Sequence, residues 1–344
     1  MANKSLNQAR ENKNDEFYTQ YNDIAEELKY YKKHFEGKVV FCNCDDPEES
    51  KFWQYFETKF DDLNIKKLIA THYNKDGSTS YALIFEGQYD ENGDAITKRI
   101  ELNGNGDFRS EEAIEFLKES DIVVTNPPFS LFREYIAQLM EYDKKFLIIG
   151  NLNAYTYREV FPLIKNNLVW TGATLFKGGA AFFVGDKSLY DPQKMSNPKH
   201  AYIKGDKLYW RVNGVRWFTN LDHEIRHKKI ILLQDYDLDN YAKYDNYDAI
   251  EVGNVKIIPD NYAGEIGVPI SFLDKYCPEQ FEIIGSFNNS VYSEKVGNDY
   301  VLSVDTPTII NGKEKSWNGP VINKVPLYKR IVIKRKDLED KPWN

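Results

Sequence analysis

Asp-Ile-Val-Val-Thr-Asn-Pro-Pro-Phe, residues 121–129, is the stretch that decides the fold of this chain. Its apolar run, residues 122–125, is typical of a buried β-strand, and a helical pattern follows at residues 131–142. The two prolines fix φ, supply no N–H group and hold the preceding residues extended, so the connecting loop is stiff. Because ligands bind open α/β sheets at the carboxyl ends of the strands, we expect a binding site at this loop.

The Asn-Pro-Pro-Phe loop carries the groups that methyl transfer to a planar amine requires. The side-chain oxygen of Asn126 and the carbonyl of Pro127 can each accept one proton of an amine such as the amino group of adenine. The nitrogen lone pair then points at a methyl donor, Phe129 stacks on the ring, and Pro128 keeps the turn rigid, so fixed dipoles stabilise the developing charge. The alternative is an ordinary strand-to-helix turn in which Ser130 caps the next helix.

Composition bounds the class of protein. The 344 residues, 42% hydrophobic and 28% charged, suffice for one large domain with an appendage or for two domains. The polar N-terminus indicates no signal peptide, and no apolar run is long enough to span a membrane, so we expect no membrane partner. Three cysteines without a regular framework favour a cytoplasmic location. A net charge of −8 argues against a protein that coats nucleic acid, but it permits a basic cleft.

A parallel sheet is predicted from the first part of the chain. Strand-like residues 38–42, a helical pattern at residues 48–60 and strand-like residues 67–71 together form a βαβ unit. The other expected elements are a helix at residues 23–35, paired strands at residues 81–85 and 96–102, a helix from Ser110, a strand at residues 146–149, a helix at residues 155–165, a hairpin at residues 169–185 and an apolar strand at residues 230–233. After about residue 185 the pattern becomes less regular, which indicates a second region.

Several stretches, in order along the chain, match one family. They are Asp-Glu-Phe-Tyr-Thr at residues 15–19, Cys-Asn-Cys-Asp-Asp-Pro at 42–47, Asn-Pro-Pro-Phe at 126–129, Val-Arg-Trp-Phe-Thr-Asn-Leu at 215–221 and Gly-Val-Pro-Ile-Ser-Phe-Leu at 267–273. Together they resemble the adenine-specific DNA methyltransferases of the EcoRI modification type, from about residue 15 to residue 285. The resemblance implies S-adenosylmethionine as cofactor and adenine in double-stranded DNA as the methyl acceptor.

The resemblance also implies a fold and a division of the chain. The fold is α/β, a Rossmann-like S-adenosylmethionine-dependent methyltransferase sheet with a C-terminal target-recognition region. Residues 1–14 are expected to form a disordered tail, residues 15–185 the catalytic domain that binds the cofactor, and residues 186–344 the region that recognises the DNA target. A monomer is expected, with a cognate restriction endonuclease as a genetic partner.

Residue roles follow from the same resemblance. Near the methionine part of the cofactor we expect Phe17, Tyr18 and Thr19; in the loop beside the cofactor, Asn43, Cys44, Asp45 and Asp46; at the cofactor's adenine, Asp107 and Phe108; and in the catalytic loop, Asn126, Pro127, Pro128 and Phe129, with Asn126 also facing the cofactor. Two departures from the usual methyltransferase pattern stand out. The loop after the first strand lacks glycine, and the second strand ends in Thr-His-Tyr rather than in an acid for the ribose. Asp45 or Asp46 is therefore the candidate for the ribose contact.

Basic residues of the later region are the candidates for DNA contacts. They are Arg211, Arg216, Lys228 and Lys229, and Arg216 is the strongest because it lies among aromatic residues after an Asn-Gly turn. The alternative role for Arg216 is to brace Trp210 and Trp217.

Two motifs have metal-like spacing. Cys42 and Cys44 are too close for the usual two-residue gap and lack a second pair. The segment from His223 to His227 matches H-E-x-x-H, but the apolar residues 230–233 follow almost at once and no third ligand is evident. We therefore expect no metal. Two other functions stay open at this point: methylation of a protein glutamine or of RNA by the same loop, and DNA binding without catalysis.

Overall fold

The computed structural model describes residues 19–44, 46–74, 77–176, 179–192, 198–287, 300–302 and 305–338. The expected tail at residues 1–14, Phe17, Tyr18 and Asp45 lie outside the described residues. The chain forms two compact units, one from Met1–Ala154 with Thr171–His223 and the other from Tyr155–Trp170 with Glu224–Asn344. This division differs from the boundary expected at residue 185, because the chain returns to the first unit after that point.

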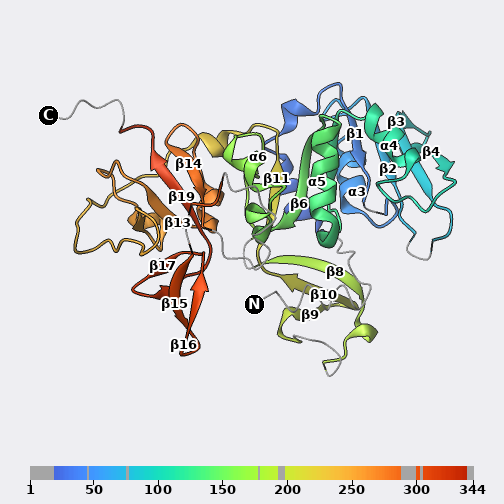
Figure 1. Ribbon diagram of the computed structural model, residues 1–344. Helices are drawn as coiled ribbons and strands as arrows, with labels where there is room; N and C mark the ends of the chain where they lie inside the picture. The colour runs from blue at the N-terminus through green and yellow to red at the C-terminus, as the bar shows by residue number, and fades with distance from the viewer. Residues whose placement is uncertain are drawn as a thin grey trace. The chain divides into compact units, whose positions relative to one another are not determined.

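Unit 1 is built on an eight-stranded sheet with the order β4-β3-β2-β1-β5-β6-β11-β7 (Figure 1). Its parallel centre consists of β1 (Val39–Cys42), β2 (Lys67–Thr71), β5 (Ile122–Thr125) and β6 (Lys145–Asn151). Its antiparallel or edge members are β3 (Tyr81–Tyr89), β4 (Ala95–Glu101), β11 (Val215–Thr219) and β7 (Trp170–Thr171). The predicted α/β class, the buried strand at residues 122–125 and the paired strands β3 and β4 are confirmed.

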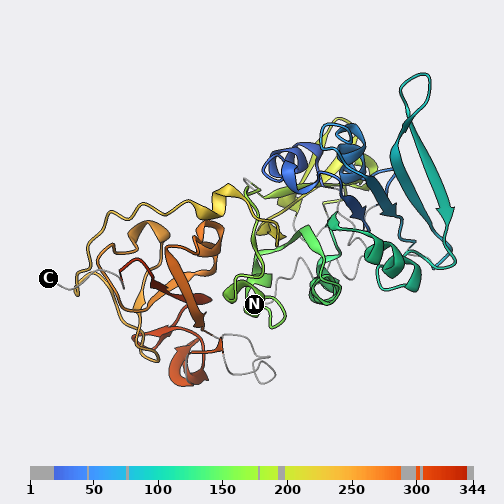
Figure 2. The same ribbon diagram turned by 90° about the horizontal axis from the view of Figure 1, so that it is seen from above.

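Helices cover both faces of this sheet (Figure 2). One face carries α2 (Tyr21–Leu28) and α3 (Lys51–Thr58), and the other carries α4 (Glu111–Glu119) and α5 (Phe132–Glu141). The Ser50 hydroxyl accepts a hydrogen bond from Phe52 N, and the Ser110 hydroxyl accepts one from Ala113 N. These caps explain where α3 and α4 begin, because each satisfies an otherwise unpaired N–H group of the first turn.

A buried carboxylate ties α2 to a later part of unit 1. Glu27 is fully buried, and its oxygens accept hydrogen bonds from Tyr31 Oη at 2.7 Å and from the backbone N–H groups of Ala173 and Thr174 at 2.7 Å each. Burial raises the pKa of Glu27. A Cβ on Gly172 would lie 2.3 Å from Glu27 Oε1, so only glycine allows this approach.

Two expected elements differ from the structure. The hairpin predicted at residues 169–185 is wrong, because β7 stays in the large sheet whereas β8 (Ala180–Asp186) joins a separate sheet of order β8-β10-β9. The hydrogen bonds to Glu27 hold the connecting residues away from a hairpin path. The helix predicted at residues 155–165 is shorter, since α6 spans Phe161–Lys165 and has proline in its first turn, a position that favours helix starts.

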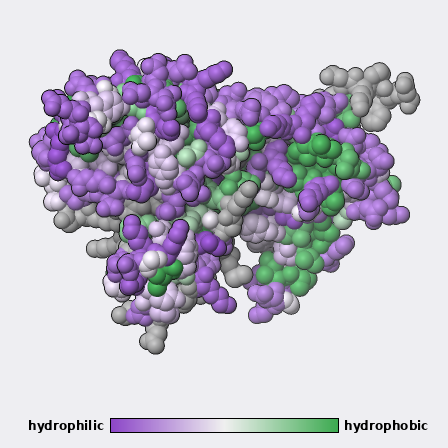
Figure 3. All heavy atoms as spheres, turned by 180° about the vertical axis from the view of Figure 1, so that it is seen from behind, coloured by the Kyte–Doolittle hydropathy of each residue, from purple (hydrophilic) through white to green (hydrophobic). Residues whose placement is uncertain are grey.

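Unit 2 contains a four-stranded sheet with the order β12-β13-β19-β14. Its strands are β12 (Ile250–Glu251), β13 (Ile266–Pro269), β19 (Arg330–Arg335) and β14 (Phe281–Ser286), and two hairpins pair β15 (Thr306–Ile310) with β16 (Lys313–Trp317) and β17 (Val321–Ile322) with β18 (Val325–Pro326). The apolar strand predicted at residues 230–233 is wrong: the segment forms no strand, and Ile231 and Leu233 are exposed. Hydrophobic side chains gather over part of unit 2 on the face seen in Figure 3.

Among the described residues, no helix is long and apolar enough to cross a lipid bilayer.

Candidate active site

Hydrogen bonds join the carboxyl ends of three neighbouring strands in the large sheet. Cys44 N, just after β1, donates to Thr125 Oγ1 at the end of β5 over 3.2 Å. Thr71 Oγ1, at the end of β2, donates to the carbonyl of Asn43 over 3.4 Å. The loop after β1 is therefore fixed from both sides, directly beside the start of the Asn-Pro-Pro-Phe loop.

Asn43 links this edge to helix α5. Its side chain is 1% exposed, and its Oδ1 accepts hydrogen bonds from the Tyr135 hydroxyl and, at 3.6 Å, from Cys44 Sγ. Its buried Nδ2 has no hydrogen-bond partner among the residues that the structure describes. The Tyr135 ring in turn packs edge-on against Phe108, with 5.0 Å between ring centroids. Residues predicted from separate motifs, Asn43 and Phe108, are thus brought together through Tyr135.

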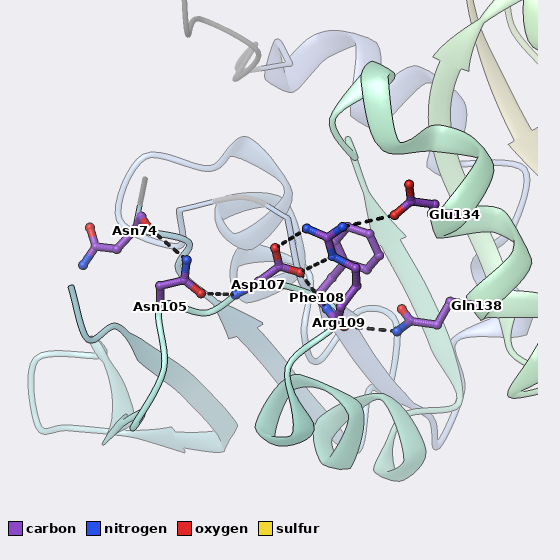
Figure 4. Close-up of polar contacts among 7 residues, drawn as sticks. All are labelled: Asn74, Asn105, Asp107, Phe108, Arg109, Glu134 and Gln138. Atoms are coloured by element: carbon purple, nitrogen blue, oxygen red, sulfur yellow. Dashed lines mark hydrogen bonds and ion pairs between the residues drawn. The ribbon is translucent and has the colours of Figure 1, made fainter. Parts of the chain in front are cut away.

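Asp107 and Phe108 lie in a polar cluster before α4 (Figure 4). Arg109 donates to Asp107 Oδ1 from its backbone N and from Nε, both at 2.9 Å, and to Oδ2 from Nη2 at 2.8 Å. These bonds lower the pKa of Asp107, so the carboxylate is ionised at neutral pH. A carboxylate offers about four acceptor positions, so Oδ2 retains one position for a further donor.

Further contacts hold Arg109 and Phe108 in place (Figure 4). Arg109 Nη1 donates to Glu134 Oε2 at 3.1 Å. Gln138 Nε2 donates to the carbonyl of Phe108 at 3.2 Å. Glu134 and Gln138 lie one turn apart on α5, so the helix that follows the Asn-Pro-Pro-Phe loop also supports the Asp107–Phe108 pair.

The loop before Asp107 requires glycine. Gly106 has φ +79°, and a Cβ at this position would lie only 1.8 Å from the His72 carbonyl oxygen. The same carbonyl accepts a hydrogen bond from Ser80 Oγ at 2.7 Å, and Asn74 N donates to the Asn105 carbonyl at 2.7 Å. The backbone of this loop therefore rests directly on the end of β2, which determines where Asp107 lies.

Asp46, a candidate for the ribose contact, pairs with residues at and beyond the end of β2. Its Oδ2 is 3.3 Å from His72 Nδ1, and its Oδ1 accepts a hydrogen bond from the Tyr81 hydroxyl at 3.3 Å. His72 also stacks on Tyr81, with 5.3 Å between ring centroids. The loop after β1 thus brings an acid next to His72, the residue that follows β2.

The Asn-Pro-Pro-Phe loop itself is well packed. Asn126 is 8% exposed, Pro127 is buried, and Pro128 and Phe129 are half-buried. A single 3-10 turn, Phe129–Leu131, leads into α5, whose first turn has no side-chain cap, so Ser130 does not cap this helix. The Phe129 ring meets Phe182 of β8 edge-on at 6.5 Å between centroids.

The structure brings most of the predicted cofactor residues that it describes to one place. The structure places Asn43, Cys44, Asp46, Asp107 and Phe108 around the carboxyl edge of one sheet. Thr19 is also buried, and its hydroxyl lacks a hydrogen-bond partner within the described part of the chain. Sequence reasoning missed Tyr135, Gln138, Arg109 and His72. Tyr135 and Gln138 lie three residues apart on the helix that follows the Asn-Pro-Pro-Phe motif, and this spacing is a signal that points to two of them.

The candidate DNA-contact residues are spread over both units. Arg211 lies on β10 (Lys207–Val212), and Arg216 lies on β11, where its Nη1 donates to the Val215 carbonyl at 2.8 Å. Lys228 and Lys229 are exposed residues of unit 2. Trp217, the neighbour of Arg216, is buried and stacks on Phe176 at 5.5 Å, in a different sheet from Trp210. The structure does not pair the two tryptophans.

The histidines of the H-E-x-x-H stretch point to different partners. His223 is buried, with Nε2 2.9 Å from the Thr171 carbonyl oxygen, whereas His227 Nδ1 lies 2.8 Å from Glu279 Oε1. Within the described ranges, no group of three histidine, cysteine, aspartate or glutamate side chains is arranged to hold a metal ion.

Comparisons with known proteins agree on one family. The family described as "Adenine-specific methyltransferase EcoRI" matches residues 5–336. The type II methyltransferase M.EcoRI of Escherichia coli is 46% identical over 358 residues, covering 98% of this chain and 98% of the relative. M.MpnI of Mycoplasma pneumoniae is 39% identical, covering 96% and 98%, and M.MgeORF184P of Mycoplasma genitalium is 36% identical, covering 97% and 99%. No solved structure matches the chain.

Proposed function

Because the chain belongs to the EcoRI family of adenine-specific DNA methyltransferases and is a site-specific DNA adenine methyltransferase, we propose that its Asn-Pro-Pro-Phe loop performs the transfer. The observation that carries this proposal is the position of the loop. It begins at the carboxyl end of β5, and the loop after β1 is hydrogen-bonded to the last residue of that strand. Open α/β sheets bind their ligands at this edge.

The methyl donor of the proposal is S-adenosylmethionine, and the residues present fit it. At this edge the buried Asn43 Nδ2 has no hydrogen-bond partner among the described residues, as expected where a ligand supplies the partner. Thr19 Oγ1, just before α2, is a second buried polar atom without such a partner. Asp107 Oδ2 retains an acceptor position for the amino group of the cofactor's adenine, beside the ring of Phe108. When bound, the cofactor supplies an activated methyl group on a sulfonium. Phe17, Tyr18, Cys44 and Asp45 remain further predicted contacts, and Asp46 is the proposed ribose contact.

The catalytic loop acts on the acceptor amine in this proposal. Asn126 Oδ1 and the Pro127 carbonyl accept the two amino protons of adenine, which directs the nitrogen lone pair toward the methyl group. Pro128 keeps the carbonyls at fixed positions because it supplies no N–H and restricts the backbone. Charge that develops on the nitrogen during attack therefore meets dipoles that are already oriented.

Access to these groups requires the adenine to leave the duplex. Its amino group lies in the major groove, and a base within the stack does not reach a loop at the edge of a sheet. We therefore propose base flipping, with the half-buried ring of Phe129 against the flipped base. Phe182 packs edge-on against Phe129 and keeps that ring in place.

Recognition of the DNA sequence falls, in the proposal, to residues 186–344, most of which form unit 2. Arg211, Arg216, Lys228 and Lys229 are proposed DNA contacts. A cognate endonuclease and a monomeric enzyme stay predictions.

A labelling experiment tests the function. The protein is incubated with methyl-labelled S-adenosylmethionine and either duplex DNA or a total protein extract. Label on the 6-amino group of adenine, with none on protein, supports the proposal. Label on protein glutamine, or no transfer to DNA by a correctly folded sample, contradicts it.

A further inference from the structure

The three-stranded sheet of unit 1 has one face that differs from the other. Its central strand is β10, flanked by β8 and by β9 (Ala201–Lys204). Side chains alternate along a strand, so Lys207, Tyr209 and Arg211 share one face and Leu208 belongs to the opposite one. Leu208 is buried, whereas Lys207 and Arg211 are exposed. The face with Lys207, Tyr209 and Arg211 is called the outer face.

An aromatic row crosses the outer face. The register places Tyr209 opposite Phe183 of β8 and opposite Tyr202 of β9. The rings of Tyr202 and Tyr209 stack with 5.3 Å between centroids, and Phe183 meets Tyr209 at 6.0 Å. No described residue hydrogen-bonds the hydroxyl of Tyr202 or Tyr209, and both side chains are partly exposed. The row therefore carries two available hydroxyl donors.

Three cations flank the aromatic row. Lys207 Nζ lies 5.2 Å from the centre of the Phe183 ring, and the Arg211 guanidinium lies 5.4 Å from the centre of the Tyr202 ring. Lys204 is opposite Lys207 in the register and is also exposed. Among the residues with described positions, none of these three cations forms an ion pair. In a chain of net charge −8, this is a local excess of positive charge.

The acids of the same sheet have other partners. Asp186 is opposite Lys207 in the register, but its carboxylate accepts a hydrogen bond from Ser188 N at 2.8 Å, which lowers its pKa. Asp206, in the turn between β9 and β10, pairs with Lys187. Within the described part of the chain, these two acids therefore form no ion pair with the cations of the outer face.

The sheet is attached to the catalytic loop through its inner face. Phe182 precedes Phe183 in β8 and points to the opposite side, where it is fully buried and contacts Phe129. Phe182 belongs to a hydrophobic cluster that also includes buried side chains from the strands of the large sheet, and Phe129 packs against this cluster. The outer face is thus part of the same compact unit as the catalytic loop.

We propose that the outer face of the β8-β10-β9 sheet binds the phosphate backbone of the duplex DNA substrate. Lys204, Lys207 and Arg211 neutralise phosphates, and the hydroxyls of Tyr202 and Tyr209 donate to phosphate oxygens, as these residue types do in protein–DNA interfaces. This inference rests on the proposed function and adds a surface that holds DNA regardless of its sequence. A multistranded surface of this kind positions the duplex, while reading of bases falls to other residues.

The first test removes the three positive charges. In the variant Lys204→Gln/Lys207→Gln/Arg211→Gln, we expect affinity for a short random-sequence duplex to fall about tenfold or more at low salt. The slope of log K against log salt should become shallower by about 2.7, because each lost phosphate contact removes about 0.9. Affinity for a duplex that the enzyme methylates should fall by the same factor.

A matched control carries the same change of charge elsewhere in unit 1. Lys33, Lys66 and Lys98 are exposed and form no ion pair with a described residue. Lys33→Gln/Lys66→Gln/Lys98→Gln should therefore change the salt slope much less. Equal slopes for the two triple variants would overturn the proposal, because net charge alone would then explain the effect.

A second test keeps the charges and removes the hydroxyls. Tyr202→Phe/Tyr209→Phe retains both rings, so folding should be unaffected, as thermal melting and cofactor calorimetry verify. We expect DNA affinity to fall about fivefold with an unchanged salt slope, since neutral donors release no counterions. Unchanged affinity in both this variant and the charge variant contradicts the proposal. Methylation by the wild-type protein distinguishes that outcome from failure of the proposed function: a wild type that methylates DNA leaves only the surface assignment overturned.

Discussion

The carboxyl edge of the large sheet and the outer face of the three-stranded sheet differ in whether their charged side chains have partners among the described residues. At the edge, Asp107 is held by Arg109, and Asp46 lies against His72 and Tyr81. On the outer face, Lys204 and Lys207 form no ion pair with a described residue. The charged groups named at the edge thus have partners within the described part of the chain, whereas these two lysines have no ion-pair partner there.

The difference distinguishes two kinds of binding site. A site that must fix reacting atoms gains from groups that are already oriented, because they need no reorganisation during the reaction. A surface that must hold a long anion gains from exposed cations, because its affinity comes from released counterions. Substitutions at the edge should therefore change the methylation rate, cofactor binding or folding, and those on the outer face should change DNA affinity in proportion to the charge removed.

The largest effect is expected at Asn126. Asn126→Ala should reduce the single-turnover rate of methylation by about 100-fold or more, by analogy with the loss of one oriented donor from an oxyanion site. Cofactor affinity, measured by calorimetry, should change little, because the amide acts on the acceptor amine. A near-normal rate in this variant would contradict the proposal that oriented dipoles at the edge of the sheet accelerate methyl transfer.

An effect on folding rather than on the reaction rate is expected at Gly106. Gly106→Ala forces a positive φ on alanine and places its Cβ against the His72 carbonyl, so we expect unfolding free energy to fall by about 2–4 kcal/mol. Chemical denaturation measures this. Gly93 is the control, because it has φ +86° and a Cβ there would meet nothing within 4 Å. Gly93→Ala should cost about 1 kcal/mol, for the backbone conformation alone.

A smaller effect, on cofactor binding, is expected at Asp107. Asp107→Ala removes the proposed acceptor for the cofactor's adenine amine and should weaken cofactor binding by roughly 1–3 kcal/mol. Calorimetry on S-adenosylmethionine measures the change. Glu115→Ala is a control on the exposed side of α4 and should bind the cofactor normally. Equal affinities for the wild type and the Asp107 variant would remove Asp107 from the site.

The smallest effect is a shift with pH. Arg109 lowers the pKa of Asp107 below its unfolded value, so the stability from this pair is present above the unfolded pKa, about 3.9, and is lost as pH falls through the lowered pKa. Arg109→Gln should move this loss of stability to higher pH. Denaturation midpoints of both proteins across the acid range test the prediction, and coincident curves would show that the pair does not couple to folding.

The sequence allowed prediction of elements whose pattern is local. The buried run at residues 122–125, the βαβ unit and the Asn-Gly hairpin each depend on neighbouring residues, and all are present. At the candidate site the resemblance supplied the expected roles of Asn43, Asp107 and Phe108, and these roles stay predictions. The supporting residues were not predictable, because their roles depend on contacts between distant segments: Tyr135 reaches Asn43 across 92 positions.

Contacts between distant segments also explain why two predicted elements, the hairpin at residues 169–185 and the strand at residues 230–233, are wrong. The hairpin expected at residues 169–185 had suitable strands and a glycine-containing turn. However, the backbone N–H groups of Ala173 and Thr174 donate to the Glu27 carboxylate instead of pairing within a hairpin. The apolar residues 230–233 looked like a strand, yet Ile231 is 81% exposed. Local propensity is a weak guide where a tertiary contact or a missing partner strand decides the outcome.

The Glu27 contact also has a consequence for synthesis on the ribosome. Helix α2 emerges early, but the backbone N–H groups that its carboxylate needs belong to residues translated about 146 positions later. Until those residues leave the exit tunnel, burial of α2 would leave the Glu27 carboxyl group without most of its hydrogen-bond donors, which is unfavourable for a buried polar group. We therefore expect nascent chains that stop before Ala173 to leave this helix open to proteases, and chains extended past β11 to protect it. The same contact thus predicts that the N-terminal helix docks late, after residues 173 and 174 have been made.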